Sequence, residues 1–448
     1  MSIGYFVAGL ESKGQDFTVE ALAKELPQAW IREALVRTGR ETQRRRRLPA
    51  IFMVWFMVLM TFYRRVSYLN LLEKLCGSWW TDENWDQDEP PCTSAVTKAR
   101  DRLGLEPLRV LFERSACEWL GQTKGVYLAG RRLSALDGVT LKTPDSPANR
   151  KYFGLPGASR GQSGYPQLRV VALVDVGTHL IQAFRHDRYR SAEVEMARDL
   201  VDDLGPTTAV LIDRNFVAYD FLWDVAQREA AFVVRLKENI EPRLVRRLGE
   251  GDAWVEVQIP RHYRRDRPDM PRTWVLRMIT FVPDGGGETI RLLTNLLDPR
   301  ACPKEAIASA YHDRWEEETA FDEIKTHLCE CTTVNRPVIF RGRKPHRVHQ
   351  ELYALATAYN LLRKLMACSV KDRGLSPRRV SFTSALERLR EAACEMMRLP
   401  TERLPHRYAQ LLFAIARTLN PERPGRKNPR AVKVKMSKYP LKRNRAVA

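Results

Sequence analysis

Cysteine is scarce in this chain, and the few cysteines follow no regular spacing. Only 8 of the 448 residues are cysteine. A small secreted fold held by disulfides needs a denser framework, so the composition excludes that class. We expect reduced, mostly buried thiols in a cytoplasmic protein.

A long hydrophobic run is also missing. The longest apolar stretch, residues 50–63, is followed at once by Arg64 and Arg65. It is shorter than the roughly 20 apolar residues that a membrane-spanning helix needs. The first residues show no basic segment followed by an apolar core, as a secretion signal would. We therefore expect a buried helix at residues 50–63 and no membrane partner.

Acidic residues are too few to balance the basic ones at the carboxyl end. The chain carries 74 Lys and Arg against 54 Asp and Glu, a net charge of +20. Residues 331–448 hold 27 basic and 7 acidic residues, which leaves 47 of each in residues 1–330. Such one-sided basicity is typical of a protein that binds nucleic acid, although a solubilising tail is the alternative. Between residues 423 and 445 there are 10 Lys and Arg and no acid, and we expect DNA contacts from Arg426, Lys427 and Arg430.

A second basic cluster precedes the apolar helix. It comprises Arg44, Arg45, Arg46 and Arg47. Such a cluster can hold DNA phosphates without sequence preference, or it can be the solvated end of a helix.

The pattern of apolar residues changes along the chain. Residues 1–125 show helical spacing, which suits a DNA-binding module or an ordinary helical bundle. From residue 126 β-rich runs appear and then alternate with helices, which indicates an α/β fold with a mixed sheet. Residues 231–302 are β-rich again, helices dominate residues 303–400, and residues 401–448 are basic. We predict five segments with these boundaries.

Three acidic residues stand at positions where they could meet. Asp137 ends an apolar strand, Asp213 follows the apolar run 209–212, and Glu318 lies in a predicted helix. If the two strands are neighbours, both aspartates emerge at one edge of the sheet, and a helix across that edge can add the glutamate. Carboxylates gathered in this way hold two divalent cations about 4 Å apart for phosphoryl transfer, and Mg²⁺ prefers such oxygen ligands.

Simpler interpretations of the same acids exist. Asp137 and Gly138 could form a plain turn, and Asp213 could cap the next helix. Other acids compete for the role: Asp145, Asp175 and Asp220.

The region of Glu318 carries the strongest signal. On an α-helix of 100° per residue, Tyr311, Arg314, Glu318 and Lys325 fall within an arc of about 60°. Arg grips phosphate oxygens with two donors, Lys with a point charge and Tyr with a hydroxyl. An ordinary surface pair between Arg314 and Glu318 is the alternative, and the helical wheel does not exclude Asp322 as the metal ligand.

The spacing Tyr311-x2-Arg314-x3-Glu318-x6-Lys325 matches the Y-R-E-K signature of the insertion-sequence-four transposases of bacteria. Asp137-Gly138 resembles the first-aspartate motif of that family, and Asp213-Arg214-Asn215-Phe216 resembles its second-aspartate motif. Residues 44–75 look like its N-terminal domain, and residues 350–363 look like the helix after the catalytic one. The resemblance covers about residues 20–440.

This resemblance implies a DDE transposase. The expected fold is an RNase H-like mixed sheet with flanking helices, interrupted by a β-rich insertion (residues 231–302), plus a helical N-terminal DNA-binding domain (residues 1–125). The catalytic core would comprise residues 126–230 and 303–400, and residues 401–448 would bind DNA or dimerise.

The resemblance also implies roles for the signature residues. Asp137, Asp213 and Glu318 would hold two Mg²⁺ ions, which Mn²⁺ could replace, and Tyr311, Arg314 and Lys325 would contact DNA phosphates. The substrates would be the terminal inverted repeats of the element and its target DNA. Cut-and-paste transposition would proceed in a homodimeric synaptic complex, in the bacterial cytoplasm at the nucleoid.

One position departs from the hairpin-forming relatives. Those relatives use an insertion Trp to stack a flipped base, but the matching position here is about Ile290. The nearest insertion tryptophans are Trp254 and Trp274. Two other functions remain open from sequence, a catalytically inactive DNA-binding derivative and an RNase H-like structure-selective nuclease.

Overall fold

The computed structural model describes most of the chain. The described residues are 20–43, 48–76, 91–158, 161–162, 164–265, 267–282, 288–329, 340–396 and 401–421. Arg44, Arg45, Arg46 and Arg47 lie outside them, as do Arg426, Lys427 and Arg430. None of the helices in these ranges is both long enough and apolar enough to cross a bilayer.

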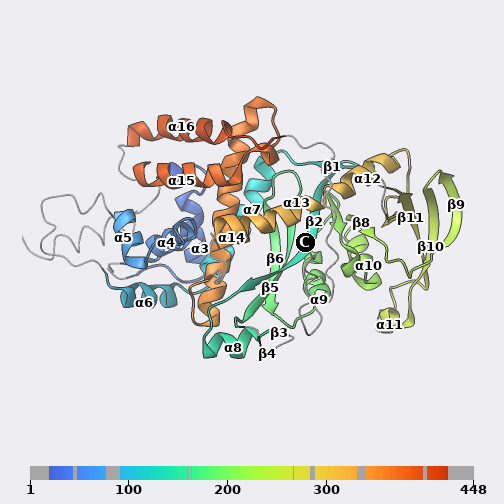
Figure 1. The fold of residues 1–448 in the computed structure, drawn as a ribbon, viewed down its shortest axis with the longest axis horizontal. Helices are drawn as coiled ribbons and strands as arrows, with labels where there is room; N and C mark the ends of the chain where they lie inside the picture. Colours follow the sequence, from blue (N-terminus) through green and yellow to red (C-terminus); the bar gives the residue numbers. More distant parts are fainter. Residues whose placement is uncertain are drawn as a thin grey trace, which may run out of the picture.

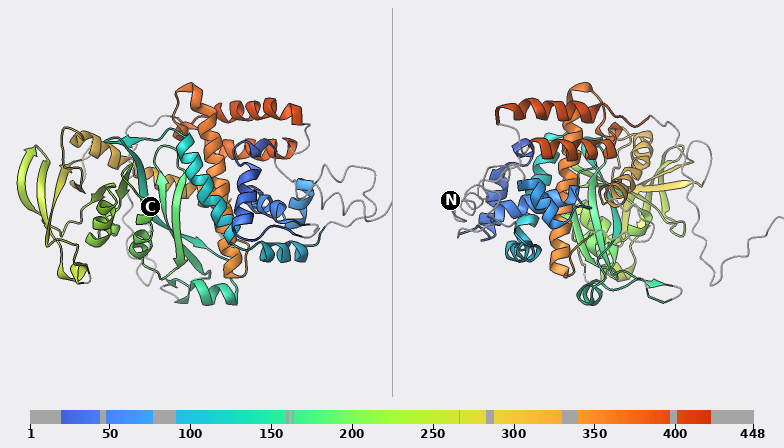
Figure 2. Two further views of the ribbon diagram at one scale, coloured as in Figure 1. Left: turned by 180° about the vertical axis from the view of Figure 1, so that it is seen from behind. Right: turned by 60° about the vertical axis from the view of Figure 1, so that its left-hand side comes forward.

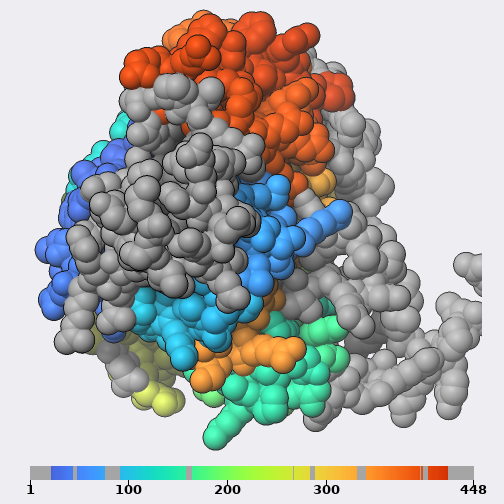
Figure 3. Space-filling view, turned by 90° about the vertical axis from the view of Figure 1, so that its left-hand side faces the viewer, coloured from blue at the N-terminus to red at the C-terminus, as the bar shows by residue number. Residues whose placement is uncertain are grey.

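A helical unit forms one end of the molecule (Figure 1), and on this face the C-terminal helices lie beside it (Figure 3). Its elements are α2 (Glu20–Ala23), α3 (Gln28–Arg37), α4 (Ala50–Phe62), α5 (Tyr68–Cys76), α6 (Thr93–Leu103) and α7 (Glu106–Gln122). All thirteen residues of α4 are buried. A helix that is apolar on every side is stable only inside a protein, so α4 is the centre around which the other helices pack. The expectation of a buried helix at residues 50–63 is thus confirmed.

Ten strands of the described part of the chain form one mixed sheet. They run in the order β6-β5-β2-β7-β8-β12-β11-β10-β9, and β1 pairs with β2 outside this path. The strands are β1 (Tyr127–Leu128), β2 (Arg131–Lys142), β5 (Gln167–Asp175), β6 (Ile181–Arg188), β7 (Thr208–Ile212), β8 (Ala231–Arg235), β9 (Arg243–Gly249), β10 (Asp252–Gln258), β11 (Thr273–Phe281) and β12 (Ile290–Thr294). A short separate hairpin joins β3 (Gly157–Ala158) to β4 (Gly161–Gln162).

The first five strands of that order have the RNase H-like arrangement. β2, β7 and β8 are parallel, whereas β5 and β6 add antiparallel strands on the other side of β2. The predicted mixed sheet is therefore confirmed. The β-rich insertion does not fold apart from it, because β12 pairs with β8 and carries β11, β10 and β9 onward in the same sheet.

Helices cover both faces of the sheet (Figures 1 and 2). On one face, β2, β5 and β6 share a core with the N-terminal helices and with the helix Pro345–Val370, and on the other they pack against the helices Glu193–Arg198 and Tyr219–Gln227. The remaining helices are α8 (Pro147–Phe153), α9 (Glu193–Arg198), α10 (Tyr219–Gln227), α11 (Arg261–Arg264), α12 (Lys304–His312), α13 (Trp315–Asp322), α14 (Pro345–Val370), α15 (Phe382–Met396) and α16 (Leu404–Ala416). The long helix α14 joins the parts, since it contacts both the N-terminal helices α4 and α7 and the C-terminal helices α15 and α16.

Candidate active site

Two aspartates lie side by side on the parallel strands β2 and β7. The last register pair between these strands joins Leu136 to Ile212, and Asp137 and Asp213 are the residues that follow. Neighbouring strands are about 4.8 Å apart, so the two side chains start from adjacent positions. The Asp137 carboxylate accepts a hydrogen bond of 2.7 Å from the Gly138 amide.

The local structure around the aspartates differs from the sequence prediction in one respect. Asp137 does not end its strand, because β2 continues to Lys142 and stays paired with β5 throughout. The alternative of a plain turn at Asp137 is wrong for the same reason. Asp213 does cap a short 3₁₀ turn, since its carboxylate accepts a hydrogen bond of 3.0 Å from the Asn215 amide.

The third acid comes from helix α13, which packs against β2. The prediction of one continuous α-helix from Tyr311 to Lys325 is wrong. Helix α12 ends at His312, α13 begins at Trp315, and the segment Glu323–Leu328 is a π-helix. The α-helical hydrogen bonds are interrupted at Arg314, whose amide bonds to the Tyr311 carbonyl at 3.2 Å in a tighter turn. π-Helical turns are frequent at functional sites.

Arg314 connects the acids in space. Its guanidinium lies 3.4 Å from the Asp213 carboxylate through Nη1 and 3.6 Å from the Glu318 carboxylate through Nη2. Its side chain is only 6% exposed. A buried cation is stable only among anions, so the arginine and the acids depend on one another.

The pKa values record this mutual dependence. Burial disfavours the charged form of Arg314, yet its pKa is raised because Tyr311, Asp213, Asp137 and Glu318 surround it. Burial raises the pKa of Asp137 to about 6, with smaller upward contributions from Asp213 and Glu318 that oppose those of the Gly138 amide and Arg314.

The two other signature residues belong to the same cluster. Burial raises the pKa of Tyr311 to about 12, and the same effect lowers the pKa of Lys325 against the attraction of Asp137. The structure thus brings Asp137, Asp213, Glu318, Tyr311, Arg314 and Lys325 into one electrostatic cluster.

A fourth carboxylate, Glu317, was not singled out from the sequence. Its side chain is 1% exposed, and neither carboxylate oxygen has a hydrogen-bond partner among the described residues. Burial and then the charge of Asp137 raise its pKa well above the ordinary value. The only signal in the sequence is the run of three glutamates at 316–318, and the periodicity does not tell which of them is buried.

A buried network of hydrogen bonds and ion pairs fixes α13 on the side away from Glu318. His179 bonds to Glu316 at 2.8 Å, and Tyr359 donates to Glu323 at 2.8 Å. Arg363 of α14 lies 3.3 Å from Glu323 and donates to the Thr178 carbonyl at 2.7 Å. These contacts tie α13 and its π-helical extension to α14 and to the turn before β6, which fixes the position of Glu318.

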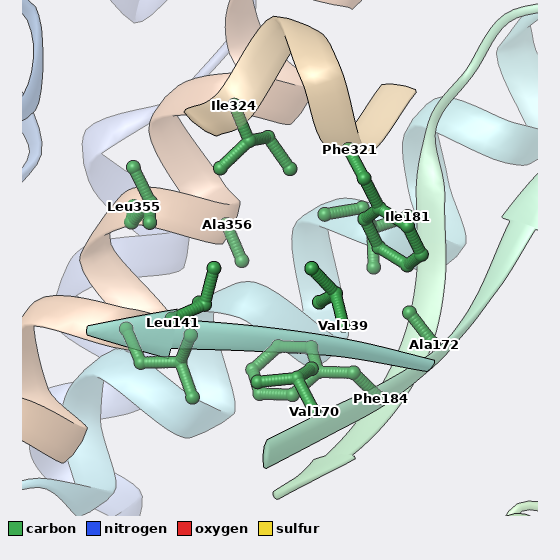
Figure 4. Close-up of a pocket in the computed structure, with 11 residues that line it drawn as sticks. Val139, Leu141, Val170, Ala172, Ile181, Phe184, Phe321, Ile324, Leu355 and Ala356 are labelled. Carbon is green, nitrogen blue, oxygen red and sulfur yellow. The ribbon is translucent and has the colours of Figure 1, made fainter. Parts of the chain in front are cut away.

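A small apolar cavity of about 30 Å³ lies beneath the same helix (Figure 4). Phe321 and Ile324 of the helix face Val139 of β2, Ala172 of β5 and Leu355 of α14 across it. Phe321 and Ile324 therefore form the buried side of this helix.

The tryptophans of the insertion have other contacts. Trp274 packs its ring against Trp223 and Phe232 in the core. Trp254 donates to the Leu297 carbonyl at 2.9 Å and lies under the Arg246 guanidinium. Ile290 begins β12.

The acids are oxygen ligands of the kind that Mg²⁺ prefers, but they are not assembled around one point. Within the described ranges, no group of three or more His, Cys, Asp or Glu side chains is arranged to hold a metal. Arg314 lies between Asp213 and Glu318. The carboxylate oxygens of Asp137, Asp213 and Glu318 are thus suitable ligands for a divalent cation. To bind one together, the three carboxylates would have to move closer to one another, with Arg314 displaced from between them.

Comparison with known proteins defines the class. Residues 16–113 match the N-terminal model of insertion element 4 transposases, and residues 128–361 match the transposase DDE domain. The chain belongs to the insertion element 4 family of DDE transposases.

Two similar proteins of Escherichia coli are named as transposases. The chain is 28% identical over 424 residues, 93% of each chain, to the transposase InsG for insertion sequence element IS4 of Escherichia coli. It is 30% identical to the putative transposase InsZ of E. coli over 47% of this chain and 69% of that one. A piggyBac transposase in a synaptic complex with hairpin DNA aligns over 91% of this chain and 86% of that chain at 12% identity, with a TM-score of 0.42.

Proposed function

We propose that this transposase moves its own insertion sequence by metal-dependent cut-and-paste transposition, with hydrolytic cleavage at the element ends and strand transfer into target DNA. The observation that carries the proposal is the position of Asp137 and Asp213 on adjacent parallel strands, linked through Arg314 to Glu318. A site of partly exposed acids around a buried arginine favours chemistry on a phosphodiester over a purely structural role.

Asp137, Asp213 and Glu318 are the proposed ligands of two Mg²⁺ ions, for which Mn²⁺ can substitute. When bound, such ions activate the attacking oxygen and stabilise the leaving one. The chain's own part is to hold the DNA. Tyr311, Arg314 and Lys325 are proposed to grip the phosphates next to the cleaved bond.

Arg314 has the clearest means to do so. Its Nε and Nη1 have no hydrogen-bond partner in the described part of the chain, and both are buried. A phosphate oxygen would satisfy these donors, and the π-helical segment places Lys325 close enough to be attracted by Asp137.

The proposed partners are double-stranded terminal inverted repeats and target DNA, bound by a homodimer in a synaptic complex in the bacterial cytoplasm at the nucleoid. Arg44, Arg45, Arg46 and Arg47 and the tail residues Arg426, Lys427 and Arg430 are proposed phosphate contacts. InsG and InsZ are named as transposases, which supports this assignment.

The test is an in vitro assay of end cleavage and strand transfer with Mg²⁺ and a DNA that carries the element ends. Glu318→Gln and Asp213→Asn should each lower cleavage by at least a thousandfold, whereas Glu305→Gln, which changes a glutamate that is 72% exposed, should not. Equal cleavage by wild type and Glu318→Gln would refute the assignment. Cleavage without strand transfer would identify a nuclease, and salt-dependent binding without either would identify an inactive DNA-binding derivative.

A further inference from the structure

The free edge of the sheet at β6 is open to another strand. β6 pairs with β5 and is the last strand on this side of the described sheet. Helix α7 runs along it (Figure 2, left), and α9 packs on the other face of β5 and β6. Between them is a groove of about 740 Å³, lined by every residue from 182 to 187.

The lining shows that the groove follows the edge of the strand. Successive residues of a strand point to opposite faces, so six consecutive residues can line one groove only if it runs along the strand edge. An exposed edge offers unpaired backbone groups to an added strand. At the first residue, Ile181, the Asn360 side chain already bonds both the amide and the carbonyl, at 2.8 Å each. The free edge therefore begins at Gln182.

The groove is acidic, although the chain as a whole has a net charge of +20. Five acids and two arginines line it: Glu113, Asp187, Glu195, Asp199, Asp203, Arg109 and Arg185. Arg109 pairs with Glu113 and Arg185 with Asp203, at 2.8 Å each, and Glu195 pairs with Arg198, which does not line the groove. Asp187 and Asp199 are the groove acids outside the ion pairs of the described residues. The groove thus suits a basic occupant.

The two sides of the groove differ. On the α7 side the rings of Phe112, Phe184 and Tyr353 pack together, with centroids 4.8–6.0 Å apart. On the α9 side are the acids Glu195, Asp199 and Asp203. An added strand that is apolar on one face and basic on the other would match both sides.

The chain contains such a segment beyond the described residues. Residues 431–436 read Ala-Val-Lys-Val-Lys-Met, with apolar residues at 432, 434 and 436 and lysines at 433 and 435. This alternation is typical of a strand with one buried face. We propose that residues 431–436 add to β6 of the same chain as an extra strand, with Val432, Val434 and Met436 against the aromatic side and the lysines against the acids.

The length and starting point of the tail permit this. The described chain ends at Pro421, and the Asn420 amide bonds to the Arg379 carbonyl at 2.6 Å. The neighbouring Arg378 lies 3.7 Å from Glu316, which bonds to His179, two residues before β6. The ten residues from Pro421 to residue 431 span up to about 33–36 Å. Because this series of contacts links the end of the described chain to the start of β6, such a span lets residue 431 reach the near end of the strand edge.

Docking of the tail would occur in the free protein and would need neither metal nor strand cutting. It anchors the end of the tail at the catalytic domain and leaves Arg426, Lys427 and Arg430 in the connecting segment. Failure of the cleavage and strand-transfer assay would therefore not bear on docking of the tail. Failure of the tail to dock would likewise not bear on the proposed transposition.

Cys117 provides the test, because it is a free, exposed thiol that lines the groove. A cysteine at position 434 (Val434→Cys) in the full-length protein should form a disulfide with Cys117 when oxidised with diamide. The control Asn428→Cys lies on the same tail but outside the docking segment. We expect Val434→Cys to crosslink at least tenfold faster than Asn428→Cys, and Cys117→Ser to abolish the product.

A charge reversal tests the acidic side. Asp199→Lys should lower the crosslinked fraction of Val434→Cys at least fivefold, whereas Asp202→Lys, which changes a neighbouring acid that is 75% exposed and does not line the groove, should leave it unchanged. Equal crosslinking rates at positions 428 and 434 would overturn the inference. So would crosslinks that form only between two chains, because the occupant would then be the tail of a second copy.

Discussion

The buried carboxyl of Glu317 leads to a specific prediction about stability. Replacing it by glutamine removes the group that would have to carry a charge beside Asp137 in a buried site. The unfolded chain ionises a glutamate at its ordinary pKa of about 4.3, whereas the folded protein keeps Glu317 protonated to a higher pH because its pKa is raised.

The sign follows from proton binding. Between the unfolded and the folded pKa, the folded state binds one proton more, so the free energy of unfolding falls as pH rises. The loss is about 1.4 kcal/mol per pH unit for one such group, until the folded pKa is reached. Glu317→Gln escapes this loss. An unsatisfied buried polar group costs a further 1–3 kcal/mol, roughly, so Glu317→Leu should gain more than the glutamine variant.

The assay is the melting temperature measured from pH 5 to pH 8 without divalent metal. The difference between Glu317→Gln and wild type should be smallest at pH 5, less than one pH unit above the unfolded pKa, and should grow toward pH 8. Glu305→Gln, which changes an exposed glutamate, is the matched control and should show no growing difference. A Glu317→Gln variant whose melting temperature tracks wild type at every pH would refute the reasoning.

Three other predictions concern the same part of the molecule. Since the pKa of Asp137 is about 6, Mg²⁺-dependent cleavage should fall about tenfold per pH unit below pH 6 as the carboxyl becomes protonated, and a rate that is flat to pH 5 would contradict this. Val170→Ile should partly fill the 30 Å³ cavity and raise the free energy of unfolding in urea by up to about 0.7 kcal/mol. Val275→Ile, at an exposed position, should give no such gain. An unchanged stability of Val170→Ile would show that the cavity cannot accept the added methylene group. Glu323→Gln leaves the buried Arg363 without its anion, so the protein should be destabilised by about 3–5 kcal/mol. The measurement is the melting temperature, which should fall. An unchanged melting temperature would show that the ion pair does not stabilise the fold.

The sequence predicted the sheet well, and the physical reason is its periodicity. The apolar runs that became β2, β5, β6 and β7 are short and β-rich, and each contributes buried residues to the observed sheet. The buried helix at residues 50–63 was equally clear, because no other environment suits it.

Local geometry near the site was less predictable. A helical wheel assumes a constant 100° per residue, and it could not show that the α-helix is interrupted at Arg314 or that residues 323–328 are π-helical. The end of β2 was misplaced because Gly138 is a turn former in isolation, whereas here it pairs with Val171 of β5. Pairing between distant strands overrides such local preferences.

The burial of Glu317 could not be predicted from the sequence at all. It depends on how α13 rotates against β2, which is set by His179, Arg363 and Tyr359 far away in the chain. The insertion shows the same limit, because its strands look independent in sequence and yet extend the central sheet through β12.

The most direct test of the proposed chemistry is anomalous diffraction from crystals of the protein bound to its element-end DNA in Mn²⁺. We predict two manganese peaks about 4 Å apart, held by the carboxylates of Asp137, Asp213 and Glu318, with the Arg314 guanidinium moved onto a DNA phosphate. Manganese bound at other residues, with Arg314 still between Asp213 and Glu318, would contradict the account.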